Sequence, residues 1–209
     1  MTKFAEAVLK KLSDKYGSRL HTQLTHSDTT ELFVAALLSP QCTDKQVNET
    51  TSILFKQFRT FKDYASSDTG TLRRQLKGIN FYKTKARHLR AASRRIVDEF
   101  GGKVPKTINE LMELDGVGRK IANVVLSEGY GINEGIAVDT HVAVTSRRLG
   151  LTRSNDPDRI EKDLAKKIPK KDWGKVNGLF IELGRDVCTA RKKYCERCVL
   201  NRICPSSTI

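Results

Sequence analysis

Four of the five cysteines in this 209-residue chain lie within its last 22 residues. They are Cys188, Cys195, Cys198 and Cys204, with the spacing C-x6-C-x2-C-x5-C. A segment this short cannot build a core of its own, so a metal bound by the thiolates would help to fold it. Structural zinc sites usually combine two C-x2–4-C pairs, whereas a single loop with one C-x2-C pair and two flanking cysteines suits a 4Fe–4S cluster. We therefore expect a 4Fe–4S cluster, with zinc or unliganded thiols as the alternatives.

Positive charge is the second strong feature of the chain. Lys and Arg number 38 against 24 Asp and Glu, which gives a net charge of +14 and a pI near 9.7. A protein this basic commonly binds a polyanion, and a basic surface without such a partner is the alternative. Arg191, Lys192 and Lys193 place part of the charge in the cysteine loop, where it would offset a negative cluster, bind phosphate, or do both.

The chain has no segment that resembles a membrane anchor. The N-terminal sequence alternates charged and apolar residues, and the longest apolar run, Leu32–Leu38, is far too short to cross a bilayer. We expect a cytoplasmic protein that has neither a signal peptide nor a membrane-spanning segment.

Apolar residues recur at helical spacing along most of the chain. Residues 4–12 carry one such stripe, and comparable stripes follow as far as residues 176–183. No segment alternates for long as a strand does. The pattern predicts an all-α protein of nine to eleven short helices. Glycine-containing turns place one helical lobe at about 22–133 and the cysteine loop in a second lobe, with the first helix able to pack on either.

A glycine turn, Gly116-Val117-Gly118, separates two helical patterns. Two glycines around one apolar residue allow a tight turn with exposed backbone N–H groups, and such groups at the start of a helix bind phosphate. Arg119 and Lys120 follow immediately and add positive charge. The alternative is an ordinary helix–turn–helix in which the glycines serve packing alone.

Lys120 is unusual because it lies in the first turn of an otherwise apolar helix. The positive end of the helix dipole disfavours an ammonium group there, and a neutral lysine amine is a nucleophile that forms Schiff bases. An exposed surface lysine is the alternative. Asp139 lies 19 residues later and begins another helix. It is either an ordinary N-cap or a carboxylate that faces Lys120 across a cleft.

The glycine turn ending in lysine, the following aspartate and the cysteine spacing together resemble the endonuclease III family of helix–hairpin–helix DNA glycosylases. Residues 38–44 (LSPQCTD) and 78–86 (GINFYKTKA) are similar to two loops of that family. The resemblance covers essentially the whole chain. It implies a bilobal all-α fold, with a six-helix barrel lobe at 22–133 and a 4Fe–4S lobe formed by 1–21 and 134–209.

The resemblance also implies roles for individual residues. Lys120 matches the catalytic lysine and Asp139 the catalytic aspartate. Gln41 matches the residue that fills the gap left by a flipped nucleotide. Phe81 lies at the position of the side chain that inserts as a wedge into the opposite DNA strand. The other implied DNA contacts are Gly116, Val117, Gly118, Arg119, Arg191, Lys192 and Lys193, and the four clustered cysteines are the implied 4Fe–4S ligands.

The implied function is that of a bifunctional DNA glycosylase and AP lyase of base excision repair. Such an enzyme removes oxidised pyrimidines through a lysine Schiff base and cleaves 3′ to the abasic site by β-elimination. The implied partner is double-stranded DNA with damaged bases or abasic sites, bound by a monomer. The alternatives are a monofunctional mismatch or adenine glycosylase, against which Lys120 argues, and a non-enzymatic iron–sulfur DNA-binding regulator.

Four positions depart from the residues common in that family. Asp115 stands in place of proline, Ile121 of threonine, Cys42 of alanine and Phe81 of leucine. A carboxylate beside a phosphate-binding turn weakens phosphate binding unless it points away. We expect these departures to affect the preferred lesion and flanking bases rather than the class of reaction.

Overall fold

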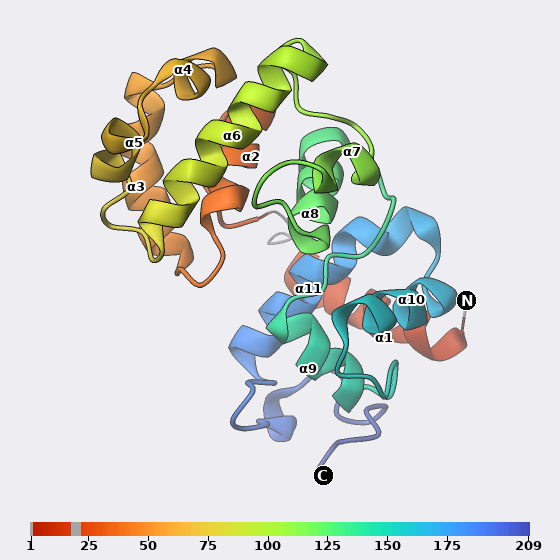
Figure 1. Ribbon diagram of the computed structural model, residues 1–209. Coiled ribbons are helices and arrows are strands. Elements are labelled where there is room, and N and C mark those ends of the chain that lie inside the picture. The colour runs from red at the N-terminus through yellow and green to blue at the C-terminus, as the bar shows by residue number, and fades with distance from the viewer. Residues whose placement is uncertain (1, 18–21) are drawn as a thin grey trace. The chain divides into compact units, whose positions relative to one another are not determined.

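The computed structural model describes residues 2–17 and 22–209. Within these residues the chain forms eleven α-helices, short 3₁₀ turns and no β-strand, which confirms the predicted all-α class (Figure 1). None of the helices in this described part is long and apolar enough to cross a membrane.

The chain divides into two compact units, each with its own hydrophobic core. We call residues 22–132 the central unit. The terminal unit combines the N-terminal helix with residues 133–209, so the two ends of the chain belong to the same unit.

The central unit is built around two helices of opposite character. Its elements are α2 (Thr29–Leu38), α3 (Asp44–Gln57), α4 (Phe61–Ser66), α5 (Thr69–Gln75), α6 (Tyr82–Phe100), α7 (Ile108–Met112) and α8 (Arg119–Tyr130). All seven residues from Leu32 to Leu38 are buried, so α2 lies inside the core. In contrast, α6 is amphipathic: Ala86, Leu89 and Ile96 are buried and the opposite face is rich in arginine.

The terminal unit contains α1 (Lys3–Tyr16), α9 (Thr140–Arg148), α10 (Pro157–Lys167) and α11 (Trp173–Asp186), with 3₁₀ turns η2 (Lys170–Asp172) and η3 (Cys195–Arg197). Helix α10 begins with an aspartate cap followed by proline, and the Asp156 carboxylate accepts from the Arg159 N–H at 2.8 Å. This cap fixes the start of α10 after a polar loop.

The N-terminal helix packs on α11, which answers the choice that the sequence left open. Lys15 Nζ and Tyr16 OH each donate to Asp186 Oδ2 at 2.7 Å. The hydrogen bond from Lys15, followed by that from Tyr16, holds the pKa of the Asp186 carboxyl below its usual range. The positive charge of Lys15 lowers this pKa further. The buried apolar face of α1, including Val8 and Leu12, completes the core of this unit.

Candidate functional site

The glycine turn before α8 has two glycines with different constraints. Gly116 has φ +78°, and a Cβ atom added there would lie 2.6 Å from His88 Nδ1, so both the backbone and the packing require glycine. Val117 is buried and anchors the turn in the core. Gly118 is the N-cap of α8 with φ −93°, and nothing lies within 4 Å of an added Cβ. Packing therefore explains the glycine at position 116, whereas the space around Gly118 is unoccupied.

The start of α8 has the features of an anion-binding helix terminus. Gly118 makes no side-chain cap hydrogen bond to α8, and the backbone N–H groups at the start of a helix can bind an anion. Arg119 and Lys120 form the first two residues of α8 and are both half-buried. Ile121 and Ala122 behind them are buried. Lys120 thus lies at the edge of the core, and its exposure is intermediate between that of a surface lysine and that of a fully buried one.

Gln41 and Phe81 share an uncommon backbone conformation. Their φ angles are 58° and 59°, and they are the only non-glycine residues with positive φ in the part of the chain that the structure describes. Both are exposed, Phe81 by 62%, which is high for an aromatic side chain. Hydrogen bonds from Asn80 and Lys85 join the two loops. Neither Asn80 nor Lys85 is among the site residues predicted from the sequence. No local pattern could have found them, because their partners lie about 40 residues away.

Asp139 is the N-cap of α9, one of the two roles considered for it. Its Oδ1 accepts from the Val142 N–H at 2.8 Å, and the residue is half-buried. The buried residues 135–138 precede it and fix its backbone. Lys120 belongs to the central unit and Asp139 to the terminal unit, so their approach across a cleft stays a prediction.

The four C-terminal cysteines line one pocket in the terminal unit. All are free thiols, and Cys195 is buried. The loop is ordered by backbone hydrogen bonds, including Cys188 N–H to the Leu183 carbonyl and Cys204 N–H to the Leu200 carbonyl, both at 2.8 Å. Across the described residues, no group of three or more His, Cys, Asp or Glu side chains is arranged to hold a metal ion.

The ionisation of these thiols is coupled. Burial raises the pKa of Cys198 above its ordinary value, and the negative charges of Cys188, Cys204 and Cys195 raise it further. Burial likewise raises the pKa of Cys204. Hydrogen bonding from Thr208 instead lowers the pKa of Cys195. Several thiolates at this pocket would therefore need a positive group to stabilise them.

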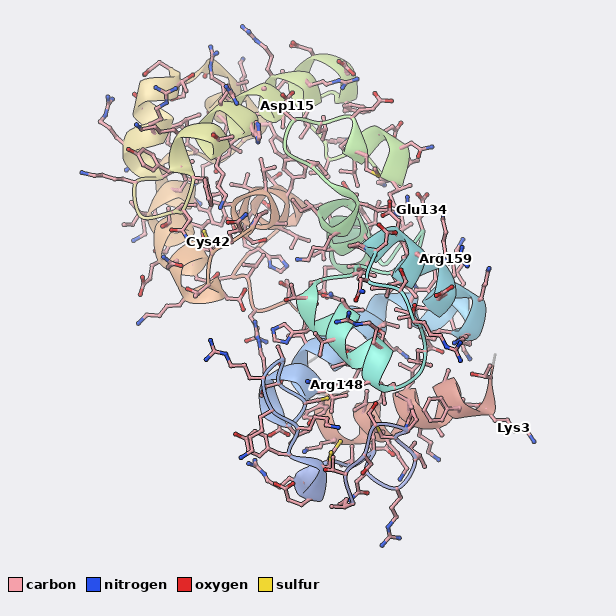
Figure 2. All side chains as sticks on the ribbon, turned by 60° about the horizontal axis from the view of Figure 1, so that its bottom comes forward. Lys3, Cys42, Asp115, Glu134, Arg148 and Arg159 are labelled. Atoms are coloured by element: carbon pink, nitrogen blue, oxygen red, sulfur yellow. The ribbon has the colours of Figure 1, made fainter. Side chains whose placement is uncertain are left out.

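Arg148, at the end of α9, holds the first half of the cysteine loop (Figure 2). Its Nη1 donates to the carbonyls of Cys188 and Thr189 at 3.1 and 2.7 Å and to Cys188 Sγ at 3.3 Å. Its Nη2 donates to the Ala190 carbonyl at 3.0 Å. Arg148 is not among the predicted site residues, because nothing near it in the chain points to a loop 40 residues away.

The predicted basic contacts of the loop have different surroundings. Lys193 Nζ donates to the Ser206 carbonyl at 2.6 Å, so its charge takes part in the structure of the loop itself. Lys192 Nζ lies 4.9 Å from the centre of the Tyr194 ring. Arg191 and Lys192 are both exposed. The three residues therefore do not form one uniform contact surface.

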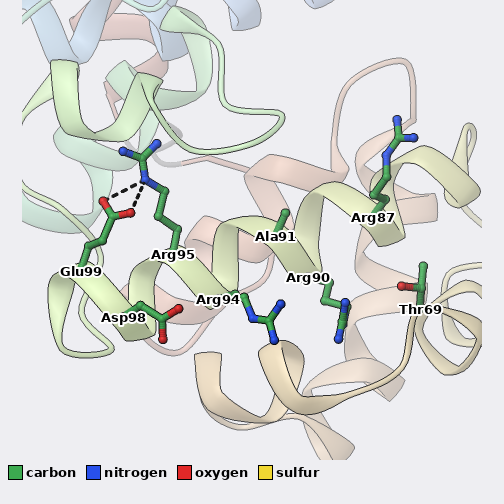
Figure 3. Close-up of a pocket in the computed structure, with 8 residues that line it drawn as sticks. All are labelled: Thr69, Arg87, Arg90, Ala91, Arg94, Arg95, Asp98 and Glu99. Atoms are coloured by element: carbon green, nitrogen blue, oxygen red, sulfur yellow. Dashed lines mark hydrogen bonds and ion pairs between the residues drawn. The ribbon is translucent and has the colours of Figure 1, made fainter.

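A further pocket of about 350 Å³ lies beside α6, where sequence analysis identified no site (Figure 3). It is lined by Thr69, Arg87, Arg90, Ala91, Arg94, Arg95, Asp98 and Glu99. Arg95 Nε donates to both carboxylate oxygens of Glu99, at 2.8 and 2.9 Å, and Arg90 Nε donates to the Ser67 carbonyl at 2.8 Å. Four arginines thus gather on α6, with Asp98 and Glu99 as the acidic residues of the same pocket.

Comparison with known protein families and sequences gives consistent results. Residues 34–170 match the HhH-GPD superfamily of base excision DNA repair proteins. The chain is 44% identical over 184 residues to endonuclease III of Synechocystis sp. (strain ATCC 27184 / PCC 6803 / Kazusa), covering 88% of this chain and 84% of that one. It is 40% identical over 200 residues to endonuclease III of Bacillus subtilis (strain 168), covering 95% and 90%.

Comparison with solved structures agrees with the sequence relatives. A trapped endonuclease III–DNA covalent intermediate superposes with a TM-score of 0.90 at 37% identity, covering 99% of this chain and 97% of that chain. A thermostable thymine-DNA glycosylase has a TM-score of 0.87 at 18% identity, covering 98% and 96%, and shares the fold.

The two glycines of the turn provide a matched pair of variants. We expect Gly116→Ala to lower the free energy of unfolding by more than about 1 kcal/mol, because alanine disfavours positive φ and would clash with His88. Gly118→Ala should change it by less than about 0.5 kcal/mol, since its backbone is already extended and its surroundings are open. Urea unfolding followed by circular dichroism measures both. Equal effects would show that the turn is not constrained as described.

Proposed function

This chain belongs to the endonuclease III family, within the HhH-GPD superfamily of base excision DNA repair proteins, and we propose that it removes oxidised pyrimidines from duplex DNA and cleaves the strand 3′ to the resulting abasic site. It is an enzyme of base excision repair, a DNA glycosylase with AP lyase activity. The observation that carries the detailed proposal is the half-buried amine-bearing residue Lys120, in the first turn of α8 directly after the glycine turn.

The proposed partner is double-stranded DNA that contains a damaged base or an abasic site, bound by a monomer inside the cell. The solved relatives at 37% identity include a covalent and a non-covalent endonuclease III–DNA complex. A net charge of +14 suits such a partner. The open backbone at Gly118 and the positive end of α8 would bind one phosphate. Asp115 is exposed beside this turn and would oppose that contact if it faced the DNA (Figure 2).

The proposed reaction begins with base flipping, since a base within the duplex cannot be reached. Gln41 and Phe81, both exposed, would fill the space left in the stack. The Lys120 amine attacks the sugar C1′, and the base leaves with the bonding electron pair and a proton. Ring opening gives a Schiff base between Lys120 and the sugar. Removal of a C2′ proton then expels the 3′ phosphate, and water releases the lysine.

Asp139 has a second task in this proposal. Its carboxylate would stabilise the positive charge that develops on the sugar, or accept a proton from the attacking amine. The N-cap hydrogen bond to Val142 restricts the rotation of the carboxylate, so the group would already be oriented when DNA binds. A monofunctional glycosylase would not use a lysine at position 120, and a non-enzymatic regulator would use neither residue.

The donor set of the C-terminal loop fits the 4Fe–4S cluster of this proposal. Four thiols line one pocket, and the Arg148 guanidinium donates to Cys188 Sγ, a contact that would favour a negatively charged cluster. The ligands would be Cys188, Cys195, Cys198 and Cys204. When bound, the cluster would cross-link a loop that lacks a core of its own, and the base-removal steps above do not pass through it.

The nucleophile can be tested by trapping the Schiff base. With a duplex that contains an oxidised pyrimidine, borohydride should yield a covalent protein–DNA adduct with the natural chain and none with Lys120→Gln, because the amide is not a nucleophile. Lys83→Gln, on the exposed face of α6, serves as the control and should trap normally. Normal trapping and strand cleavage by Lys120→Gln would assign the chemistry to another residue.

Two substitutions at Asp139 separate capping from catalysis. Asparagine caps helices as well as aspartate does, so Asp139→Asn should keep the free energy of unfolding within about 0.5 kcal/mol, whereas Asp139→Ala should lose about 1 kcal/mol. Both should lower the single-turnover rate of base release by about 100-fold or more, because each removes the charge. If Asp139→Asn remains active, the residue is an N-cap and has no role in the reaction.

The cluster can be tested with the fifth cysteine as the control. Protein purified without oxygen should contain about four iron and four sulfide per chain, and Cys198→Ala should lose most of both while Cys42→Ala retains them. We expect Cys198→Ala to unfold more readily and to bind DNA more weakly. Zinc in place of iron, or equal iron in the two variants, would contradict the assignment.

A further inference from the structure

The amine of Lys85 is buried and bound on three sides. Lys85 lies in the first turn of α6 and is 7% exposed. Its Nζ donates to the carbonyls of Leu38 and Pro40 at 2.8 and 2.7 Å, and to Cys42 Sγ at 3.3 Å. An ammonium group has three protons, so these three acceptors use all of them. Lys85 therefore holds both sides of Gln41, the residue between Pro40 and Cys42.

A second hydrogen bond joins the same loop to the residue before Phe81. Asn80 Nδ2 donates to the Gln41 carbonyl at 2.6 Å. Phe81 is the N-cap of α6, and its carbonyl accepts from the Lys85 N–H at 3.0 Å. The chain from Asn80 to Lys85 thus contacts residues 38–42 at four points, all within the central unit.

The backbone of Gln41 and Phe81 needs such support. Both have left-handed φ angles, which cost energy in residues other than glycine and persist where the surrounding contacts enforce them. Because the two side chains are exposed, they gain little from burial in return. Turn hydrogen bonds from the Cys42 N–H to the Ser39 carbonyl and from the Tyr82 N–H to the Ile79 carbonyl close each loop locally. The side-chain hydrogen bonds of Lys85 and Asn80 add the long-range contacts that join the two loops.

We propose that Lys85 and Asn80 are positioning residues for base flipping, which fix Gln41 and Phe81 at a set separation before DNA binds. The inference rests on the proposed insertion of these two side chains into the duplex. Because both loops are already ordered, DNA binding would not have to offset the loss of conformational entropy that ordering them would cause. The binding energy would be available to unstack and unpair the damaged base.

A comparison of paired and unpaired lesions tests this proposal, because a lesion in single-stranded DNA needs little opening of a stack. We expect Asn80→Ala and Lys85→Met each to lower the ratio of kcat/KM on duplex to kcat/KM on single-stranded substrate by about 10-fold or more. Borohydride trapping on a single-stranded abasic site should stay within about twofold of the natural chain. Lys83→Met, an exposed lysine of the same helix, should leave both readouts unchanged.

A double variant tests whether Asn80 acts on the reaction through Gln41. Gln41→Ala should lower the same ratio, and adding Asn80→Ala to it should cause little further loss, because Asn80 would act through Gln41. Asn80 is exposed, so its variant is expected to fold even if Lys85→Met does not.

The possible failures of the inference are distinguishable. Equal losses on duplex and single-stranded DNA, or additive losses in the double variant, would reduce Asn80 and Lys85 to structural roles and overturn the inference. A normal ratio for Gln41→Ala would refute the proposed insertion and the inference with it. If borohydride traps no adduct between the natural chain and the single-stranded abasic site, the proposed lysine chemistry would be refuted instead.

Discussion

A charged amine inside a protein is unfavourable unless each of its protons is bound. Lys85 meets this condition with two carbonyl oxygens and one thiol, from the end of α2 and the loop that follows it. One of these, the Leu38 carbonyl, belongs to the last residue of α2, where the helix dipole favours a positive charge. The contact therefore satisfies a carbonyl at the end of the buried helix and ties the loop that follows to the start of α6.

Because of this contact, α6 organises one whole edge of the central unit. Its first turn holds the loop of Gln41 and carries Phe81 as its cap. Farther along, His88 packs against the glycine turn before α8, and Arg95 Nη2 donates to Glu113 Oε2 at 2.6 Å. Two loops that are remote in sequence, residues 39–43 and 113–118, are thus positioned by one 19-residue helix. Small movements of α6 would change both together.

The sequence predicted well what depends on local pattern. Helical stripes identified the all-α fold, and the glycine turn identified the boundary before the helix that carries Lys120. What it could not predict are contacts between distant segments: Lys85 with Leu38, Arg148 with the cysteine loop, and α1 with α11. A lysine at a helix start has the same local sequence whether its amine reaches solvent or a carbonyl 47 residues away. Asp139 shows a different limit, since a cap and a catalytic carboxylate share one sequence pattern.

The distribution of the chain between the two units has a consequence for synthesis. Helix α1 is synthesised before the central unit but belongs with α11, and Lys15 must reach Asp186, which is 171 residues later. The central unit, residues 22–132, has its own core and can fold while the rest is still being made. During that interval the buried face of α1 has no partner. The terminal unit can form only after residues 133–209 have been made, so its assembly should follow the folding of the central unit.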